Sequence, residues 1–194
     1  MDNYRRYLES QGYDVSLQWP ELESRVKRNV FKKGSLIVDD TTPNFDIFFL
    51  DSGCVRFFTT TDDGEFTNDF IEAPNAFGTN IGVYPQRINL VNVQAITEVE
   101  IYVLKPEDLE LMNNKYPGFK EIGEQTVGQL LKKRNEYAKM LAQTTPEERY
   151  IHFMKTQTSL LQIVPQHMIA SYLGIKPESL SRIRKRIFSR PDKL

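Results

Sequence analysis

Short segments with alternating apolar and polar positions fill the first half of the chain. In residues 91–95 and 99–103 an apolar side chain occupies every second position, so each segment can bury one face of a strand. Turns containing Gly34, Gly53 and Gly64 separate neighbouring segments. The strands predicted in this way are 35–38, 46–50, 55–59, 66–71, 90–95 and 99–104. Many short strands at regular spacing predict a small antiparallel β-barrel or jelly roll.

After residue 106 the apolar period becomes helical. We predict helices over 107–116 and 117–143, with two more over 1–11 and 20–26 before the barrel. The long helix carries a stripe spaced alternately by four and three residues: Gly123, Val127, Leu130, Arg134, Tyr137 and Leu141. Such spacing is typical of a coiled-coil seam and predicts pairing with a second copy of the chain. Packing of the stripe on the chain's own barrel is the alternative interpretation.

A helix-turn-helix pattern occupies residues 166–186. It follows a capping box at Thr145 and Glu148, which predicts a preceding helix from Pro146 to about residue 161. Gly174 permits a left-handed turn between the two helices, and Pro177 suits the first turn of the second. The apolar positions that can meet between the helices are Ile169, Leu173, Leu180 and Ile183. Two amphipathic helices of an ordinary core are the alternative.

The outward side of the second helix carries residue types that contact DNA. Glutamate accepts hydrogen bonds from cytosine, arginine binds guanine through two donors, and basic or hydroxyl side chains bind phosphates. The residues that we expect to contact double-stranded DNA are Glu178, Ser179, Ser181, Arg182, Lys185 and Arg186.

Charge is distributed unevenly along the chain. The net charge of −1 argues by itself against a nucleic-acid partner, but residues 145–194 hold nine basic and four acidic side chains, a net charge of +5 that leaves −6 for residues 1–144. A solvated helix end accounts for part of the basic cluster at residues 184–186 without accounting for its place beside the helix-turn-helix.

Several classes of protein are disfavoured by the composition. No apolar run is long enough for a membrane span, and the first residues lack a signal-peptide pattern, so we expect a cytoplasmic protein. Cys54 is the single cysteine and is expected to be a small buried hydrophobe. Both histidines, His152 and His167, fall in the basic C-terminal part, which disfavours haem, a metal site or a metal-dependent jelly-roll enzyme. We expect no catalytic residues and no enzymatic activity.

The order of barrel, long helix and helix-turn-helix resembles the Crp/Fnr (cyclic-AMP receptor) family of transcription regulators. Residues 31–37, 48–55, 63–65 and 76–78 are similar to its barrel motifs, and 178–182 to part of its recognition helix. The resemblance implies an α+β fold with an effector domain over 1–116, a dimerisation helix over 117–144 and a DNA-binding domain over 145–194. The short tail leaves little chain for a wing, which we expect to be reduced.

The resemblance also implies function. It predicts a homodimer on a palindromic operator, contact with RNA polymerase, and base contacts from Glu178 and Arg182. Pro177 stands at a position that is often basic in the family, so one contact is in doubt there. The alternative function is a cyclic-nucleotide-binding-like sensor or interaction module without strong DNA binding.

The nucleotide pocket departs from the family pattern. Where cyclic-AMP binders have a carboxylate, an arginine and a hydroxyl, this chain has Thr79, Asn89 and Leu90. A buried cyclic phosphate would lack its cationic partner unless a shifted loop brought Arg87 to it. We therefore expect no response to cyclic AMP and no cofactor. The barrel is either an unliganded scaffold or holds another effector near Thr79, Asn80, Arg87, Asn89 and Arg134.

Overall fold

The computed structural model describes residues 1–41, 44–62, 64–79 and 91–189. The chain forms two compact units. Unit 1 comprises Met1–Thr59 and Asp69–Leu131, and unit 2 comprises Thr60–Asn68 and Lys132–Leu194. The division therefore falls within a hairpin of the barrel and within the long helix.

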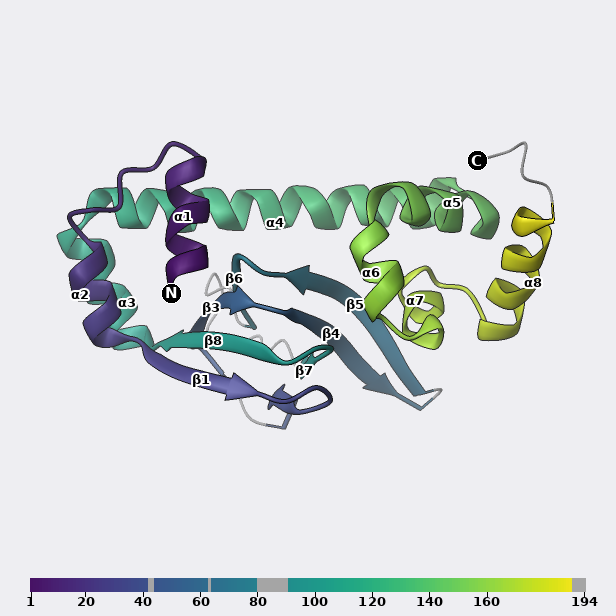
Figure 1. Ribbon diagram of the computed structural model, residues 1–194, viewed down its shortest axis with the longest axis horizontal. Helices are drawn as coiled ribbons and strands as arrows, with labels where there is room; N and C mark the ends of the chain where they lie inside the picture. The colour runs from purple at the N-terminus through teal and green to yellow at the C-terminus, as the bar shows by residue number, and fades with distance from the viewer. Residues whose placement is uncertain (42–43, 63, 80–90, 190–194) are drawn as a thin grey trace. The chain divides into compact units, whose positions relative to one another are not determined.

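Two four-stranded antiparallel sheets form the predicted jelly roll (Figure 1). The first has the order β1 (Lys27–Phe31), β8 (Val99–Leu104), β3 (Ile47–Ser52) and β6 (Asn75–Gly78). The second has the order β2 (Leu36–Val38), β7 (Asn92–Ala95), β4 (Cys54–Thr61) and β5 (Gly64–Glu72). β1 is an edge strand and pairs with β8, with Lys27 opposite Val103.

Aromatic and β-branched side chains from both sheets fill the space between them. Phe48 of β3 stacks on Phe77 of β6 with ring centroids 5.0 Å apart. Phe57 of β4 meets the same ring edge-on at 5.2 Å. All three side chains are buried, so the described part of the barrel interior is a packed core.

Helices cover the outer face of the first sheet in unit 1. They are α1 (Asp2–Ser10), α2 (Trp19–Arg25), α3 (Pro106–Lys115) and the start of α4 (Pro117–Gln143). A second buried cluster joins them to the sheet and includes Tyr4, Trp19, Phe49, Met112 and Ile122. Asp51 of β3 accepts a hydrogen bond of 2.9 Å from the Tyr4 backbone N–H, so a strand residue satisfies a free donor at the start of α1.

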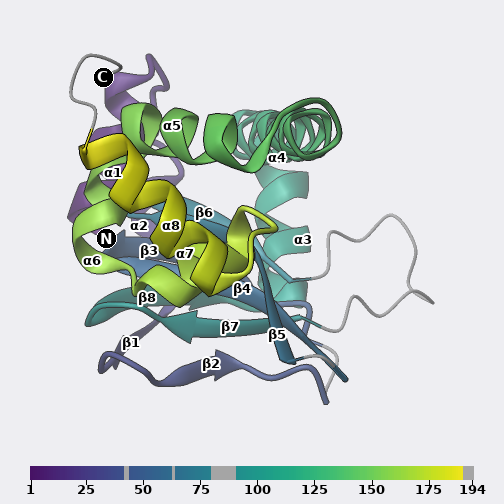
Figure 2. The same cartoon turned by 90° about the vertical axis from the view of Figure 1, so that its right-hand side faces the viewer.

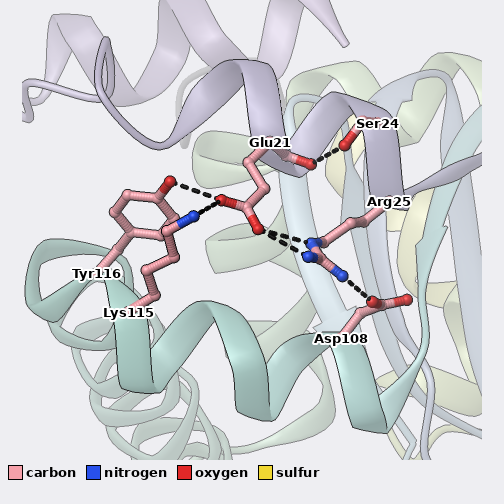
Figure 3. A network of polar contacts seen from close by, with 6 residues as sticks. All are labelled: Glu21, Ser24, Arg25, Asp108, Lys115 and Tyr116. Carbon is pink, nitrogen blue, oxygen red and sulfur yellow. Dashed lines mark hydrogen bonds and ion pairs between the residues drawn. The ribbon is translucent and has the colours of Figure 1, made fainter.

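A polar network connects α2 to both ends of α3 (Figure 3). The Glu21 carboxylate accepts hydrogen bonds from Lys115 Nζ at 2.6 Å and the Tyr116 hydroxyl at 2.7 Å. Arg25 donates to the same carboxylate at 2.7 Å and reaches Asp108 at 2.6 Å. The Lys115, Tyr116 and Arg25 hydrogen bonds together lower the pKa of Glu21 to about 2.

Unit 2 adds four helices (Figure 2). They are α5 (Pro146–Thr156), α6 (Thr158–Ile163), α7 (Gln166–Tyr172) and α8 (Pro177–Phe188). The predicted capping box is present, because Thr145 and Glu148 each bond the other's backbone N–H. The prediction of one helix to about residue 161 is wrong, since the chain leaves helical geometry at Gln157. The described residues 132–189 contain no strand.

Candidate nucleic-acid interface

The helix-turn-helix is built on the predicted apolar positions. All four predicted positions are buried: Ile169 of α7, Leu173 at the end of that helix, and Leu180 and Ile183 of α8. Gly174 has a φ of +62°, the left-handed conformation expected in the turn. The Ile175 N–H returns to the Ala170 carbonyl at 2.9 Å, which closes the end of α7. The turn and the core thus fix the position of α8 relative to α7.

The outward side of α8 presents most of the predicted contact residues to solvent. Glu178, Ser181, Arg182, Lys185 and Arg186 are exposed, and Ser179 is partly exposed. Arg182 donates a 3.4 Å hydrogen bond to the Ser179 hydroxyl. That contact is long and lies at the surface, so it leaves the guanidinium able to turn toward a base.

The start of α8 adds a feature that the sequence analysis missed. Lys176 is the exposed N-cap residue, and no side chain caps the helix. The N–H groups of the first turn therefore have no side-chain acceptor, a geometry suited to a phosphate oxygen. The signal was present as a lysine directly before Pro177.

Arg186 forms an ion pair with Glu147 of α5. This ion pair competes with the phosphate contact predicted for the same arginine. A phosphate contact requires Arg186 to leave Glu147 or to share its donors. Lys185, one position earlier on α8, has no such partner among the described residues, so it is the better placed of the two for a phosphate contact.

Two arginines of the basic C-terminal part are largely or partly buried. Arg149 is 9% exposed, and its Nη1 donates to the carbonyls of Leu141 at 3.0 Å and Thr144 at 3.2 Å. It thereby caps the last turn of α4. Arg184 is partly buried, with an Nε that is enclosed and unpaired in the described structure. The count of +5 thus overstates the charge available to DNA.

The last turns of α4 pack against the chain's own helix-turn-helix. The Tyr137 ring stacks on Tyr172 of α7 with centroids 4.9 Å apart, and its hydroxyl donates to the Tyr172 carbonyl. A Cβ placed on Gly174 would lie 3.5 Å from Leu141 Cδ2. The last two positions of the predicted seam, Tyr137 and Leu141, therefore contact unit 2 of their own chain, and pairing of the stripe with a second copy stays a prediction.

A hairpin segment completes unit 2. The Ser171 hydroxyl accepts a hydrogen bond from the Thr67 N–H at 2.9 Å and donates to the Glu65 carbonyl at 3.1 Å. Both partners belong to β5, and the Thr67 side chain is buried. Nothing in the local sequence of α7 indicates this pairing, since the partners lie a hundred residues earlier.

Comparisons with known proteins agree with this architecture. Residues 28–116 match the family of the cyclic nucleotide-binding domain. FixK2 from Bradyrhizobium japonicum is 17% identical, with a TM-score of 0.72 over 86% of each chain. The c-di-GMP responsive global regulator CLP of Xanthomonas campestris is 17% identical, with a TM-score of 0.72 over 91% of this chain and 92% of its own. A protein from Eubacterium rectale assigned to the crp/fnr family is 12% identical, with a TM-score of 0.70 over 92% and 85%.

The chain has the fold of the Crp/Fnr regulators. A comparison with curated proteins finds no match. The family of the cyclic nucleotide-binding domain covers the barrel and α3, and the solved structures extend the likeness to the helical part.

The effector residues expected from the Crp/Fnr resemblance are only partly described. Asn80, Arg87, Asn89 and Leu90 lie outside the described residues. Thr79 is buried in unit 1, and its hydroxyl donates to the Asn44 carbonyl at 2.9 Å. Arg134 is an exposed residue of unit 2. The Thr79 hydroxyl is therefore already engaged by the protein backbone.

The described residues also give the surroundings of the side chains that could bind a metal ion. They contain no group of three or more histidine, cysteine or acidic side chains placed to hold a metal ion. His152 and His167 are both exposed, while Cys54 is buried, as expected of a small core residue. Across the helices of the described chain, none combines the length and apolar character needed to cross a bilayer.

Proposed function

We propose that the chain is a sequence-specific, DNA-binding transcription regulator of the Crp/Fnr type. The observation that carries the proposal is the exposed side of α8, where Glu178, Ser181, Arg182 and Lys185 stand on a helix fixed by buried apolar contacts. A rigid helix with charged and hydroxyl groups on its outer side is the unit that enters the major groove. We expect it to act in the cytoplasm, without enzymatic activity, and to contact RNA polymerase.

The residues of α8 divide the work of recognition. Arg182 is assigned to the two acceptors of a guanine, and Glu178 to the amino group of a cytosine. Lys185 and the uncapped first turn of α8 bind phosphates, and Arg186 joins them when it leaves Glu147. Base contacts give specificity, while phosphate contacts set the register of the helix on the duplex.

We further propose that α4 holds a homodimer on a palindromic operator. Of its 27 residues only Ile122 is buried within the chain, and Leu131 is 54% exposed. A long helix with so little intramolecular burial has an apolar side available to a second copy. Since Tyr137 and Leu141 contact their own helix-turn-helix, we assign the pairing to the part of α4 before them.

Cyclic AMP is not the expected effector. Thr79 replaces the carboxylate of the family pattern and donates its hydroxyl to Asn44. The packed rings of Phe48, Phe57 and Phe77 occupy the described interior of the barrel. Calorimetric titration with cyclic AMP should give no heat, and micromolar binding would refute this part of the proposal. Loss of that binding in Arg87→Ala would then identify Arg87 as the phosphate partner.

Selection of binding sites from random duplex DNA tests the main proposal. We expect enrichment of a palindrome and nanomolar binding at about 100 mM salt, with an affinity that falls steeply as salt rises. The second candidate is an interaction module without DNA binding, which the engagement of Arg186 by Glu147 favours. No retardation of any duplex at about 50 mM salt would support that module and contradict the regulator.

A further inference from the structure

Unit 1 contains a cavity outside the barrel, between α1, β6 and the first half of α4. Its volume is about 190 Å³. Its lining includes Tyr4 and Tyr7 of α1, Ala76 of β6, and Gln125 and Gln129 of α4. This volume exceeds that of an engineered apolar cavity of about 150 Å³ that holds benzene. One aromatic ring with a small substituent therefore fits.

The lining is polar but carries no charge. It combines tyrosine rings with amide and hydroxyl groups, and no acidic or basic side chain belongs to it. The cavity is partly open, since Gln125 and Gln129 are exposed, and an ion placed there would lose part of its hydration without gaining a partner of opposite charge. A neutral ring with hydrogen-bonding groups would instead stack on tyrosine and pair with the amides.

Tyr4 gives the cavity a donor that the fold does not use. The residue is 4% exposed and lines the cavity, yet its hydroxyl makes no hydrogen bond in the described structure and is not among the fully enclosed polar atoms. Burial raises the pKa of this hydroxyl, so it stays protonated and able to donate at neutral pH. A nearly buried hydroxyl without a protein partner is available to donate to a molecule in the cavity.

Tyr13 and Gln125 close one side of the cavity. The Tyr13 hydroxyl donates to the Gln125 side-chain oxygen, which connects the loop after α1 to α4. The geometry points to a binding site for a small, uncharged aromatic molecule with an amide-like or phenolic hydrogen-bonding group, separate from the barrel interior and from α8. A molecule bound there bridges α1 and α4.

Three isosteric probes test the site with the intact protein: benzamide, benzoate and benzamidine. We expect benzamide to shift unit 1 resonances saturably in NMR titration with a millimolar Kd, and benzoate and benzamidine to bind at least tenfold more weakly. Ala76→Leu adds bulk to the lining of the cavity and should abolish benzamide binding. Binding of benzamide that survives Ala76→Leu, or equal binding of benzoate, overturns the proposal.

Two further variants keep the proposal testable if Ala76→Leu does not fold. Gln125→Glu retains an acceptor for Tyr13 but adds a negative charge, so benzamide should weaken and benzamidine should bind at least tenfold better than it does to the unchanged protein. Tyr4→Phe should weaken benzamide about two- to tenfold without lowering the melting temperature, because no internal hydrogen bond is lost. An unchanged preference among the probes in both variants contradicts the assigned lining.

Discussion

Arg149 donates a 3.0 Å hydrogen bond to the Leu141 carbonyl and so ties the start of α5 to the end of α4. Arg149→Met retains the buried stem but leaves the Leu141 and Thr144 carbonyls without their donor. We expect a loss of about 1.5–3 kcal/mol in the free energy of unfolding, as for hydrogen bonds that involve a charged group. Urea denaturation followed by circular dichroism measures it. Lys155→Met, an exposed change on the same helix, is the control and should cost almost nothing.

Arg182 and Lys185 are expected to contribute differently to DNA binding, the first through a base and the second through a phosphate. Arg182→Ala should cost about 1–3 kcal/mol on the selected operator and far less on unrelated duplexes, because the lost contacts are to a base. Lys185→Ala should weaken binding to all sequences alike and reduce the salt slope by about one, because the lost contact is to a phosphate. Fluorescence anisotropy across a salt series measures both. Equal losses of Arg182→Ala on operator and random DNA would reject its role in base reading.

The dimer interface can be tested with two leucines of equal exposure. Leu131 on α4 is 54% exposed and Leu111 on α3 is 53% exposed. Leu131→Glu should yield monomers in light scattering, since a charge would be buried against the second copy. Leu111→Glu should remain a dimer. A dimeric Leu131→Glu protein would locate the interface outside this part of α4.

Gly53 and Gly34 have nearly the same backbone conformation but different surroundings, so alanine variants of the two separate the cost of the conformation from the cost of a clash. Their φ values are +88° and +86°, but a Cβ on Gly53 would lie 2.3 Å from the Glu98 carbonyl oxygen, whereas nothing lies within 4 Å of one on Gly34. Alanine at Gly34 should cost about 1–2 kcal/mol for the left-handed conformation alone. At Gly53 a clash of about 1–3 kcal/mol is added. Similar melting temperatures for the two variants would contradict the close approach.

Acid should weaken unit 1 through Glu100. Hydrogen bonds from Arg28 at 2.7 and 3.0 Å and from the Tyr102 hydroxyl at 2.7 Å lower the pKa of Glu100 to about 2. Because the pKa is lower in the folded state, the contribution is complete above about pH 4.5 and is lost as the pH falls toward 2. Glu100→Gln should therefore show a smaller drop in urea midpoint between pH 6 and pH 3. An identical drop would exclude this contribution.

The sequence predicted the fold well where the pattern was strong. The predicted bounds of α4 and β8 agree with the structure. A long apolar stripe is compatible only with a helix, and a strict alternation only with a strand. β1 was missed because Lys27, Arg28 and Asn29 give an edge strand no alternation. β6 was missed because four residues are too few to show a period.

The candidate site was predicted in outline and not in its contacts. The types and spacing of the α8 residues indicated which side chains would be exposed. The ion pair of Arg186 with Glu147 and the bonds of Ser171 to β5 depend on tertiary structure, which local patterns do not encode. Tyr137 is a further example. An apolar stripe defines one face of a helix, but it does not specify which surface packs against that face.

The pairing of β1 with β8 has a consequence for synthesis of the chain on the ribosome. Lys27 can pair with Val103 only after Val103 has left the ribosome. β1 therefore stays unpaired while the strands between β1 and β8 are synthesised. The contacts of α5 to α8 with one another lie close together in the chain, and the β5 segment that bonds Ser171 has been made long before them, so these helices can form soon after they leave the exit tunnel. Nascent chains that end before residue 104 should therefore remain sensitive to protease, whereas the last fifty residues add a module that folds late but quickly.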